Sequence, residues 1–338
     1  MGGTVIVSNA ALDRWLAILI AALLATGFAT WRAGSSDTAW VYVLHGILAG
    51  GLLAASALKV KRSLPRATRG RRWGRLLIAL PMIGLCFLSL GTGFVWVAGG
   101  RLIDLGPWTL LGWHAILALA LLPLLVVHLA PRRWRVLKVA GTRSGRPISR
   151  RALLGTGGLA VAGLAVWGLA GVADLIGRQP RRFTGSRWLP ADGVPIPTTF
   201  FGEGTPIIDP AGWRLLVKGS VERELELSLD ELRALGGTEL TAVLDCTGGW
   251  AMESTWSGVP MSALLEAAGV KEGAQRVDVR SVTGWAAGLS MEEASGTFLA
   301  TGVGGMELPA GNGAPCRLVV PQRRGLDWVK WVTEVSIS

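Results

Sequence analysis

Five long apolar segments fill the first half of the chain and constrain its fold more than any other feature. They lie at residues 13–31, 40–58, 74–98, 108–129 and 152–177. As a helix, each segment is long enough to cross about 30 Å of hydrocarbon. Tryptophans, which favour the membrane interface, lie near several segment ends: Trp15, Trp31, Trp40, Trp96 and Trp108. The alternative, buried helices of a soluble protein, does not require apolar runs of this length. We therefore expect an all-α transmembrane bundle of five spans over residues 1–177, surrounded by membrane lipid.

The positive charge of the chain is concentrated in two connecting stretches. The formal net charge is +11, yet residues 59–75 and 132–151 each carry eight Lys or Arg and no Asp or Glu. Without these stretches the remainder is negatively charged, so a nucleic-acid-binding surface is not expected. Basic loops stay on the cytoplasmic side of the cell membrane. With five spans, this places the N-terminus in the cytoplasm and everything after residue 177 outside it.

A short basic motif precedes the fifth segment. Ser149, Arg150 and Arg151 are followed by Ala-Leu-Leu, a pattern that resembles an internal bacterial twin-arginine export signal. That route carries domains that fold, and take up a cofactor, before they cross the membrane. The alternative is that the two arginines only anchor the inner end of a helix.

All three histidines of the chain, His45, His114 and His128, lie inside apolar segments. A histidine is costly in a membrane span, so each is a candidate for function. His45 and His114 each lie near the outer end of an inward-running span, and we expect them to hold the iron of one haem b. His128 lies fourteen residues after His114 on nearly the same helix face. That spacing resembles two-haem transmembrane cytochromes b, but the second span offers no inner histidine as a partner. A haem iron on His128, and a bundle without haem, stay as alternatives.

The pattern changes after the fifth segment. Residues 178–194 are predicted to be a linker, and residues 195–338 a mixed α/β domain. Strands are expected at 213–221, 241–246, 276–282, 316–321 and 332–338, and helices at 228–235 and 259–270. The chain has three cysteines, Cys86, Cys246 and Cys316, too few for a disulfide framework. An important cysteine is therefore expected to act singly, and Cys246 ends a predicted strand.

Two separate motifs carry a resemblance to a known family. Cys246 opens the run CTGGW, which is followed by WSGVP at 256–260 and by ALL at 263–265. The second motif is NGAPCRLVVP at 312–321, followed by Gly325 and by WVKW at 328–331. Together they resemble the sulfite-oxidase-fold molybdopterin oxidoreductases, and within them the catalytic subunits of protein-methionine-sulfoxide reductase. The resemblance covers roughly residues 195–338 and implies a Mo-molybdopterin cofactor.

The resemblance implies a role for each matching residue. Cys246 would be the catalytic ligand, since a soft thiolate suits molybdenum. Positions that grip the pterin and its phosphate are matched by Asn312, Arg317, Trp328, Val329 and Lys330, with further cofactor contacts at Thr283, Thr198, Phe201 and Gly202. Cys316 stands where the family has an apolar residue, so it is expected in the core.

The substrate side chains of the family are absent. Sulfite oxidases carry an arginine soon after the ligand cysteine, and the methionine-sulfoxide reductases carry a glutamate two positions after it. Here the residues are Thr247, Gly248 and Gly249. The resemblance therefore implies the cofactor and leaves the substrate open.

These features predict a molybdenum-dependent oxidoreductase fused to a cytochrome-b-like membrane domain. Electrons from quinol or another membrane carrier would pass through haem b to an extracytoplasmic site, which reduces a small or protein-bound oxidised substrate by oxygen-atom transfer. One alternative is oxidation of a sulfur compound such as sulfite, with electrons passed into the membrane. Another, of a different class, is a non-catalytic binding domain on a membrane anchor.

Overall fold

The computed structural model describes residues 9–70, 73–102, 104–106, 108–130, 150–177, 180–191, 193–199 and 203–338. The chain forms two compact units. The first contains Met1–Thr30 and Asp37–Gly185, and the second contains Trp31–Ser36 and Ser186–Ser338. The basic connection after the fourth apolar segment, with Ser149 of the suspected export signal, lies outside the described residues.

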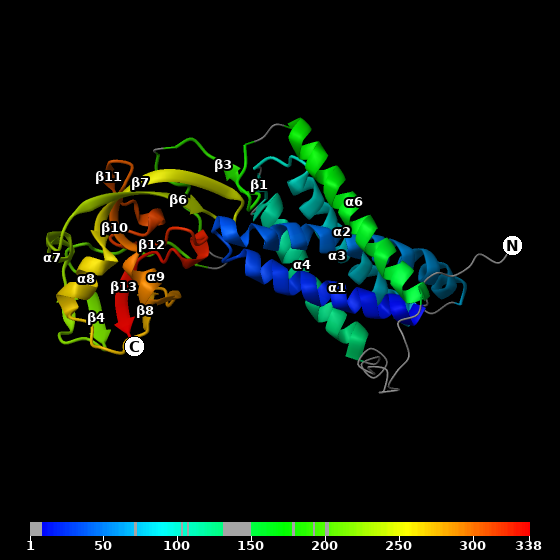
Figure 1. Ribbon diagram of the computed structural model, residues 1–338, viewed down its shortest axis with the longest axis horizontal. Helices are drawn as coiled ribbons and strands as arrows, with labels where there is room; N and C mark the ends of the chain where they lie inside the picture. The colour runs from blue at the N-terminus through cyan, green and yellow to red at the C-terminus, as the bar shows by residue number, and fades with distance from the viewer. Residues whose placement is uncertain are drawn as a thin grey trace. The chain divides into compact units, whose positions relative to one another are not determined.

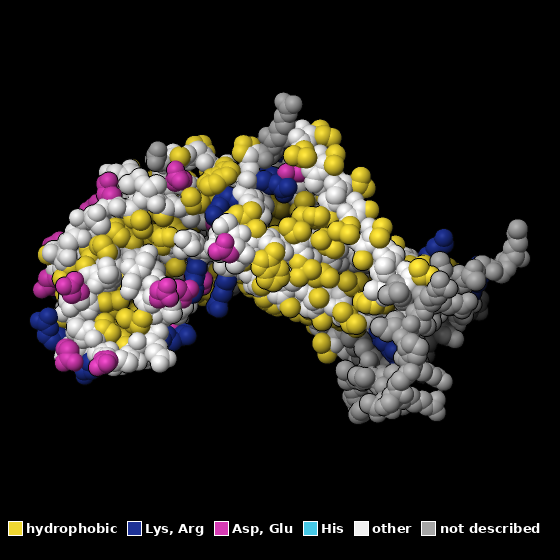
Figure 2. Space-filling model, in the orientation of Figure 1, with side chains coloured by type: hydrophobic (Ala, Val, Ile, Leu, Met, Phe, Trp, Pro, Cys, Tyr) yellow, Lys and Arg dark blue, Asp and Glu magenta, His cyan; other side chains and the backbone are white. Residues whose placement is uncertain are grey.

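The first unit is helical, as the apolar segments predict (Figure 1). Its long helices are α1 Asn9–Thr30, α2 Ala39–Arg69, α3 Trp73–Val97, α4 Leu110–Leu129 and α6 Arg150–Gly177. Short elements connect them: η1 Ser36–Thr38, β1 Asp104–Leu105 and β2 Trp108–Thr109. All five helices are long and apolar enough to cross a membrane. Figure 2 shows hydrophobic side chains spread over the surface of this unit.

Several helix ends differ from the expected ones, and two of these differences have a clear local cause. α2 continues beyond residue 58 to Arg69, because the basic stretch there consists mostly of good helix formers and the first glycine is Gly70. The fourth helix begins at Leu110 rather than at 108, since Trp108 and Thr109 form β2. The hydroxyl of Thr109 then caps the helix by accepting from the amide of Gly112 at 3.1 Å.

Small residues let two helices of the first unit approach closely. On α2, Gly50 meets the backbone of Gly163 on α6, and a Cβ at Gly50 would lie 2.6 Å from the Gly163 carbonyl oxygen. One turn earlier, Gly46 faces the ring of Trp167. Without side chains at these positions, the two helix backbones can pack at this short distance. Beside them, Lys59 on α2 forms an ion pair with Asp13 on α1.

The second unit contains two mixed sheets. The six-stranded sheet consists of β3 Arg187–Trp188, β6 Thr238–Asp245, β7 Trp250–Pro260, β10 Phe298–Val303, β11 Met306–Glu307 and β12 Arg317–Val319. In it β7 lies between β10 and β3, β11 and β12 pair with β10, and β6 pairs with β7. The five-stranded sheet has the order β5-β4-β13-β8-β9. Its strands are β4 Leu215–Gly219, β5 Leu225–Leu227, β8 Arg276–Ser281, β9 Ala286–Ser290 and β13 Val332–Ile337.

Helical turns connect these strands: α7 Leu229–Ala234, α8 Met261–Ala268, α9 Met291–Ser295, η3 Ala310–Asn312 and η4 Gly325–Asp327. The expected helix at 228–235 forms with a reciprocal cap between Ser228 and Glu231. The helix predicted to end at Gly269 does so, with this glycine at φ 65°. The predicted mixed α/β domain is therefore confirmed.

Six strands of the second unit were not predicted: β3, β5, β7, β9, β10 and β11. Two of them, β7 and β3, lie next to the turn that carries Cys246. β7 runs over residues that looked like a motif between a strand and a helix, because Ser257, Gly258 and Pro260 are poor strand formers. β3 lies within the stretch predicted as linker and pairs in parallel with the start of β7. Both additions bring structure to the strand end at Cys246, where the candidate site lies.

Candidate active site

Cys246 lies at the turn between β6 and β7. Its amide donates to the carbonyl of Trp250 at 2.8 Å, and its carbonyl accepts from the amide of Gly249 at 3.1 Å. Gly249 has φ 99°, a conformation that glycine adopts without strain. The amide of Gly248 points at the sulfur, with 3.3 Å between N and Sγ. The turn thus fixes a thiol at the end of a paired strand.

The Cys246 side chain is buried, with 8% of the residue exposed. Burial raises the pKa of its thiol, and the amide of Gly248 and the charge of Arg324 oppose that change. A free thiol here is therefore protonated at neutral pH. A soft metal ion would bind it as the thiolate and displace the proton.

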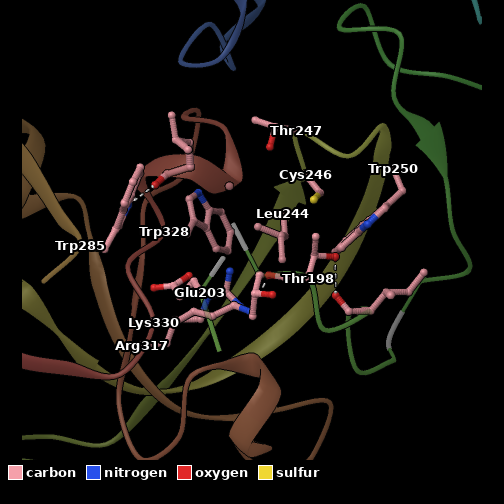
Figure 3. A pocket seen from close by; sticks show the side chains of 14 residues that line it. Thr198, Glu203, Leu244, Cys246, Thr247, Trp250, Trp285, Arg317, Trp328 and Lys330 are labelled. Carbon is pink, nitrogen blue, oxygen red and sulfur yellow. Dashed lines mark hydrogen bonds between the residues drawn. The ribbon is translucent and has the colours of Figure 1, made fainter. Parts of the chain in front are cut away.

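A pocket opens at this sulfur. It encloses about 660 Å³ of space free of protein atoms, open solvent at its mouth included. Its lining consists of Ile196, Thr198, Thr199, Glu203, Leu244, Cys246, Thr247, Trp250, Trp285, Arg317, Gly325, Leu326, Trp328 and Lys330. Figure 3 shows Arg317, Lys330 and Glu203 grouped together, apart from Cys246.

Arg317 is the buried charge of this pocket, with 3% of the residue exposed. Its Nη1 donates to the carbonyl of Asn312 at 3.0 Å, and its guanidinium lies 5.3 Å from the ring of Trp256 and 5.8 Å from that of Trp328. Its Nε is buried, and no acceptor among the described residues reaches it. Burial lowers the pKa of Arg317 to about 10, so the side chain is charged at neutral pH. A buried cation with an unused donor fits an anionic ligand.

Lys330 adds a second cation. Its Nζ donates to the carbonyl of Thr198 at 2.7 Å and to that of Gly311 at 2.6 Å. Burial, and then the neighbouring charge of Arg317, lower the pKa of Lys330 to about 8. The two cations together suit a phosphate group better than a single charge does.

The structure brings some of the predicted residues together and not others. Cys246, Thr198, Arg317, Trp328 and Lys330 all line the pocket. The remaining predicted contacts have other partners or lie outside the described residues. Asn312 donates from its side chain to Pro195, Thr283 donates to Glu203, the carbonyl of Val329 accepts from Leu318, and Phe201 and Gly202 lie outside the described residues.

Several lining residues were missed by sequence reasoning. Glu203, Trp250 and Trp285 line the pocket without having been proposed for it. Trp285 lies two residues after Thr283, which was predicted as a cofactor contact, and its indole donates to the carbonyl of Leu326 at 3.0 Å. Glu203 follows directly after Gly202, so its position beside a predicted cofactor contact was a usable signal.

These residues fit the implied cofactor. The thiol of Cys246 supplies a soft ligand, and the unused donor of Arg317, together with Lys330, suits the phosphate of a pterin. The aromatic walls Trp250 and Trp328 provide flat apolar surface for a ring system. The donor set thus matches both the metal end and the phosphate end of molybdopterin.

Two histidines meet in the first unit. The rings of His45 on α2 and His114 on α4 have centroids 6.1 Å apart and planes 84° apart. Nδ1 of His114 donates to the carbonyl of Ser89 at 2.8 Å, and Nδ1 of His45 lies 2.8 Å from the hydroxyl of Thr26. In the His45 tautomer with its proton on Nδ1, the ring donates to the Thr26 hydroxyl while that hydroxyl donates to its own helix. Nε2 of each ring then carries the lone pair that a metal needs.

The second unit matches a known family. Residues 202–338 match the model of the oxidoreductase molybdopterin binding domain. This part of the chain is therefore a molybdopterin-binding oxidoreductase domain, as its two motifs predict. The first unit lies outside the matched residues.

Curated relatives are similar to the same part of the chain. The protein-methionine-sulfoxide reductase catalytic subunit MsrP of Xanthomonas campestris pv. campestris is 33% identical over 163 residues, which are 40% of this chain and 51% of that protein. The MsrP of Gluconobacter oxydans is 29% identical over 220 residues, 56% of this chain and 69% of that protein. The chain thus spans about half the length of the first of these relatives.

One solved structure is similar as well. The sulfane dehydrogenase SoxCD from Paracoccus pantotrophus is 28% identical, with 40% of each chain covered and a TM-score of 0.38. Because this TM-score is low, the family assignment is based on the sequence matches described above and not on the structural likeness.

Proposed function

We propose that this protein is a membrane-bound molybdopterin oxidoreductase that reduces an oxidised substrate by oxygen-atom transfer outside the cytoplasm. Electrons would reach the site from quinol or another membrane carrier through one haem b in the first unit. The observation that carries the proposal is the Cys246 thiol, which faces a pocket that also contains the buried cation Arg317 with an unused donor.

At the molybdenum site, the protein's own groups bind and orient. The Cys246 thiolate would hold the metal, while Arg317 and Lys330 would hold the phosphate end of the cofactor. The bound cofactor would supply the two-electron oxygen-atom transfer chemistry. Trp250 and Trp328 line the pocket with apolar surface.

The geometry of His45 and His114 supports a haem between them. One metal ion could be held by both imidazoles only where the two rings lie close together. The two centroids here are separated by 6.1 Å. Gly93 lies against the ring of His114, and a Cβ there would come within 2.9 Å of the ring. The imidazole therefore fits beside the neighbouring helix because residue 93 has no side chain. His128 lies near the other end of α4 and is the candidate for a second iron.

The membrane placement rests on hydropathy and charge. The five apolar helices would span the cell membrane with the basic stretches in the cytoplasm. The second unit would then lie on the outer side, and an export signal at Arg150 and Arg151 would let it cross after it has taken up its cofactor.

The substrate follows least directly from the site. The MsrP relatives are named as protein-methionine-sulfoxide reductases, and a sulfoxide is the first substrate class to test. Gly248, two positions after Cys246, offers no carboxylate. Among the described residues that line the pocket, Glu203 carries one. Sulfite oxidation is the second class, with electrons passed the other way.

Metal analysis and a visible spectrum of the purified protein test the proposal. We expect molybdenum and a Soret band in the wild type, with dye-driven reduction of a sulfoxide. Cys246→Ser should lose its molybdenum and fall to background turnover, because a hydroxyl is a poor ligand for a soft metal site. The matched control is Cys316→Ala, since Cys316 is fully buried beside Arg317 and its thiol pKa is raised by burial.

The outcomes separate the parts of the proposal. Full molybdenum loading in Cys246→Ser would overturn the ligand assignment. The absence of a Soret band after expression in a haem-replete host would end the haem proposal and leave the molybdenum site untouched. Turnover of sulfite, with no reduction of any sulfoxide, would show that electrons flow from the substrate to the membrane carrier, opposite to the proposed direction.

A further inference from the structure

A buried charged group outside the pocket holds the backbone of Cys246. Nη2 of Arg324, in the loop before η4, lies 2.7 Å from the Cys246 carbonyl oxygen, 3.1 Å from Oδ1 of Asp245 and 3.2 Å from Oγ of Ser186. The Ser186 hydroxyl donates to the same oxygen of Asp245 at 2.6 Å. Three segments far apart in sequence thus meet at one peptide group.

The energetics do not explain this group as a source of stability. Arg324 is 3% exposed, and Asp245 and Ser186 are fully buried. Burial of two opposite charges costs several kcal/mol per ion before their attraction offsets it, and apolar residues of similar size are often as stable. What a buried pair provides, and apolar residues do not, is one fixed direction for each hydrogen bond.

The surrounding contacts leave the Cys246 backbone little freedom. Its amide is bonded to Trp250, and its carbonyl accepts from both Gly249 and Arg324. Gly325, next to Arg324, lies so close that a Cβ there would be 3.1 Å from Leu244 and 3.5 Å from the Cys246 Cα. The loop that carries Arg324 is therefore packed against the strand end that carries the thiol.

We propose that Arg324, Asp245 and Ser186 form a positioning network that sets the direction in which the Cys246 thiolate meets the metal. The proposal rests on the proposed function, in which Cys246 binds molybdenum. Groups that orient a ligand influence metal affinity and the electronic state of the metal, although they do not touch it. None of the three belongs to the two motifs that predicted the site.

The test uses the full-length protein purified with its cofactor. The double variant Arg324→Met/Asp245→Leu removes both charges together, which avoids leaving one buried and unpaired. Arg324→Lys keeps the charge but not the planar fork. The matched control is Arg276→Met/Asp278→Leu, a variant of an ion pair on β8 that is exposed and does not line the pocket.

We expect the double variant to show an altered electron paramagnetic resonance spectrum of the bound molybdenum and a kcat lower by about 10- to 100-fold. Loss of molybdenum with an unchanged circular dichroism spectrum supports the proposal as well. The control should retain the wild-type spectrum and kcat. A loaded double variant with wild-type spectrum and kcat would overturn the network.

If the double variant does not fold, Arg324→Lys decides by the same spectrum. A shifted spectrum supports the proposal, and an unchanged spectrum with unchanged kcat rejects it. Failure of the proposed function looks different, because the wild type would then lack molybdenum or Cys246→Ser would keep it.

Discussion

In the helical unit, His45 and His114 each have one hydrogen bond from Nδ1 to a neighbouring helix. In the sheet unit, Cys246 is held through its amide, its carbonyl and its sulfur, and a buried ion pair supports the carbonyl. The difference teaches that the two candidate ligand sets need different amounts of support. The packing of two helices is enough to position two rings relative to each other. A single thiolate in a turn keeps its direction only when its loop is held from several sides.

The largest effect should come from the helical unit, in which His45 and His114 are the proposed haem ligands. We expect His114→Leu to remove the Soret band and to abolish quinol-driven turnover, because one imidazole of the pair is lost. Turnover driven by a soluble dye should persist, since the molybdenum site does not use His114. Val126→Ala, an exposed position on the same helix with no proposed role, is the matched control. Loss of dye-driven turnover in His114→Leu would show that the two sites are not separable.

The next effect concerns the scaffold of the helical site. We expect Gly163→Leu to destabilise the first unit by about 2 kcal/mol or more, because overpacking a close helix contact forces the backbone apart. A Cβ at Gly163 would lie 2.5 Å from the carbonyl of Ile47, whereas one at Gly168, on the same helix, meets nothing within 4 Å. Gly168→Leu is therefore the control. Equal thermal unfolding of the two variants in detergent would contradict the close contact.

In the sheet unit, Arg317→Met should separate binding from stability. A charge-assisted hydrogen bond is worth about 1.5–3 kcal/mol, so cofactor retention should weaken by roughly 10- to 100-fold. The cofactor-free variant should be at least as stable as the wild type, because a buried cation without a carboxylate partner is costly. Retention is measured as molybdenum content after dialysis, and stability by thermal unfolding. A destabilised apo variant would indicate a structural role for the charge.

The smallest effect is a pH dependence. The pKa of Lys330 falls from 10.5 to about 8 on folding, so between these values the unfolded chain binds more protons than the folded one. The stability of the cofactor-free protein therefore gains from Lys330 as pH rises from about 8 to 10.5. The difference in unfolding free energy between wild type and Lys330→Met should shift in favour of the wild type across this window. A difference that does not change with pH would mean that Lys330 is solvated.

The sequence predicted the helices because apolar runs of this length have few other uses. It predicted Cys246, Arg317 and Lys330 through two motifs, and these residues line one pocket. It did not predict β7, since Gly258 and Pro260 obscure the strand pattern. The predicted second span ends at residue 58, because the basic stretch after it is typical of a loop, whereas α2 continues to Arg69.

The parts of the site that escaped prediction depend on tertiary contacts. Arg324, Asp245 and Ser186 come from separate segments and carry no spacing signal of their own. The motif predicts Asn312 as a cofactor contact, and that role stays a prediction; its side chain also donates to the carbonyl of Pro195, a contact between distant segments that no motif indicates.

The turn at Cys246 also bears on the order in which the second unit folds. The thiol lies on a hairpin whose strands are adjacent in sequence, so this half of the pocket needs only local loop closure. Arg317 and Lys330 come much later, and the stretch that carries them leads into β13, which lies between β4 and β8 in the five-stranded sheet. Non-local pairing of this kind is slow. The hairpin that carries the thiol is thus expected to pair early, whereas Arg324, which holds the Cys246 carbonyl, reaches it together with the later segments that carry Arg317 and Lys330.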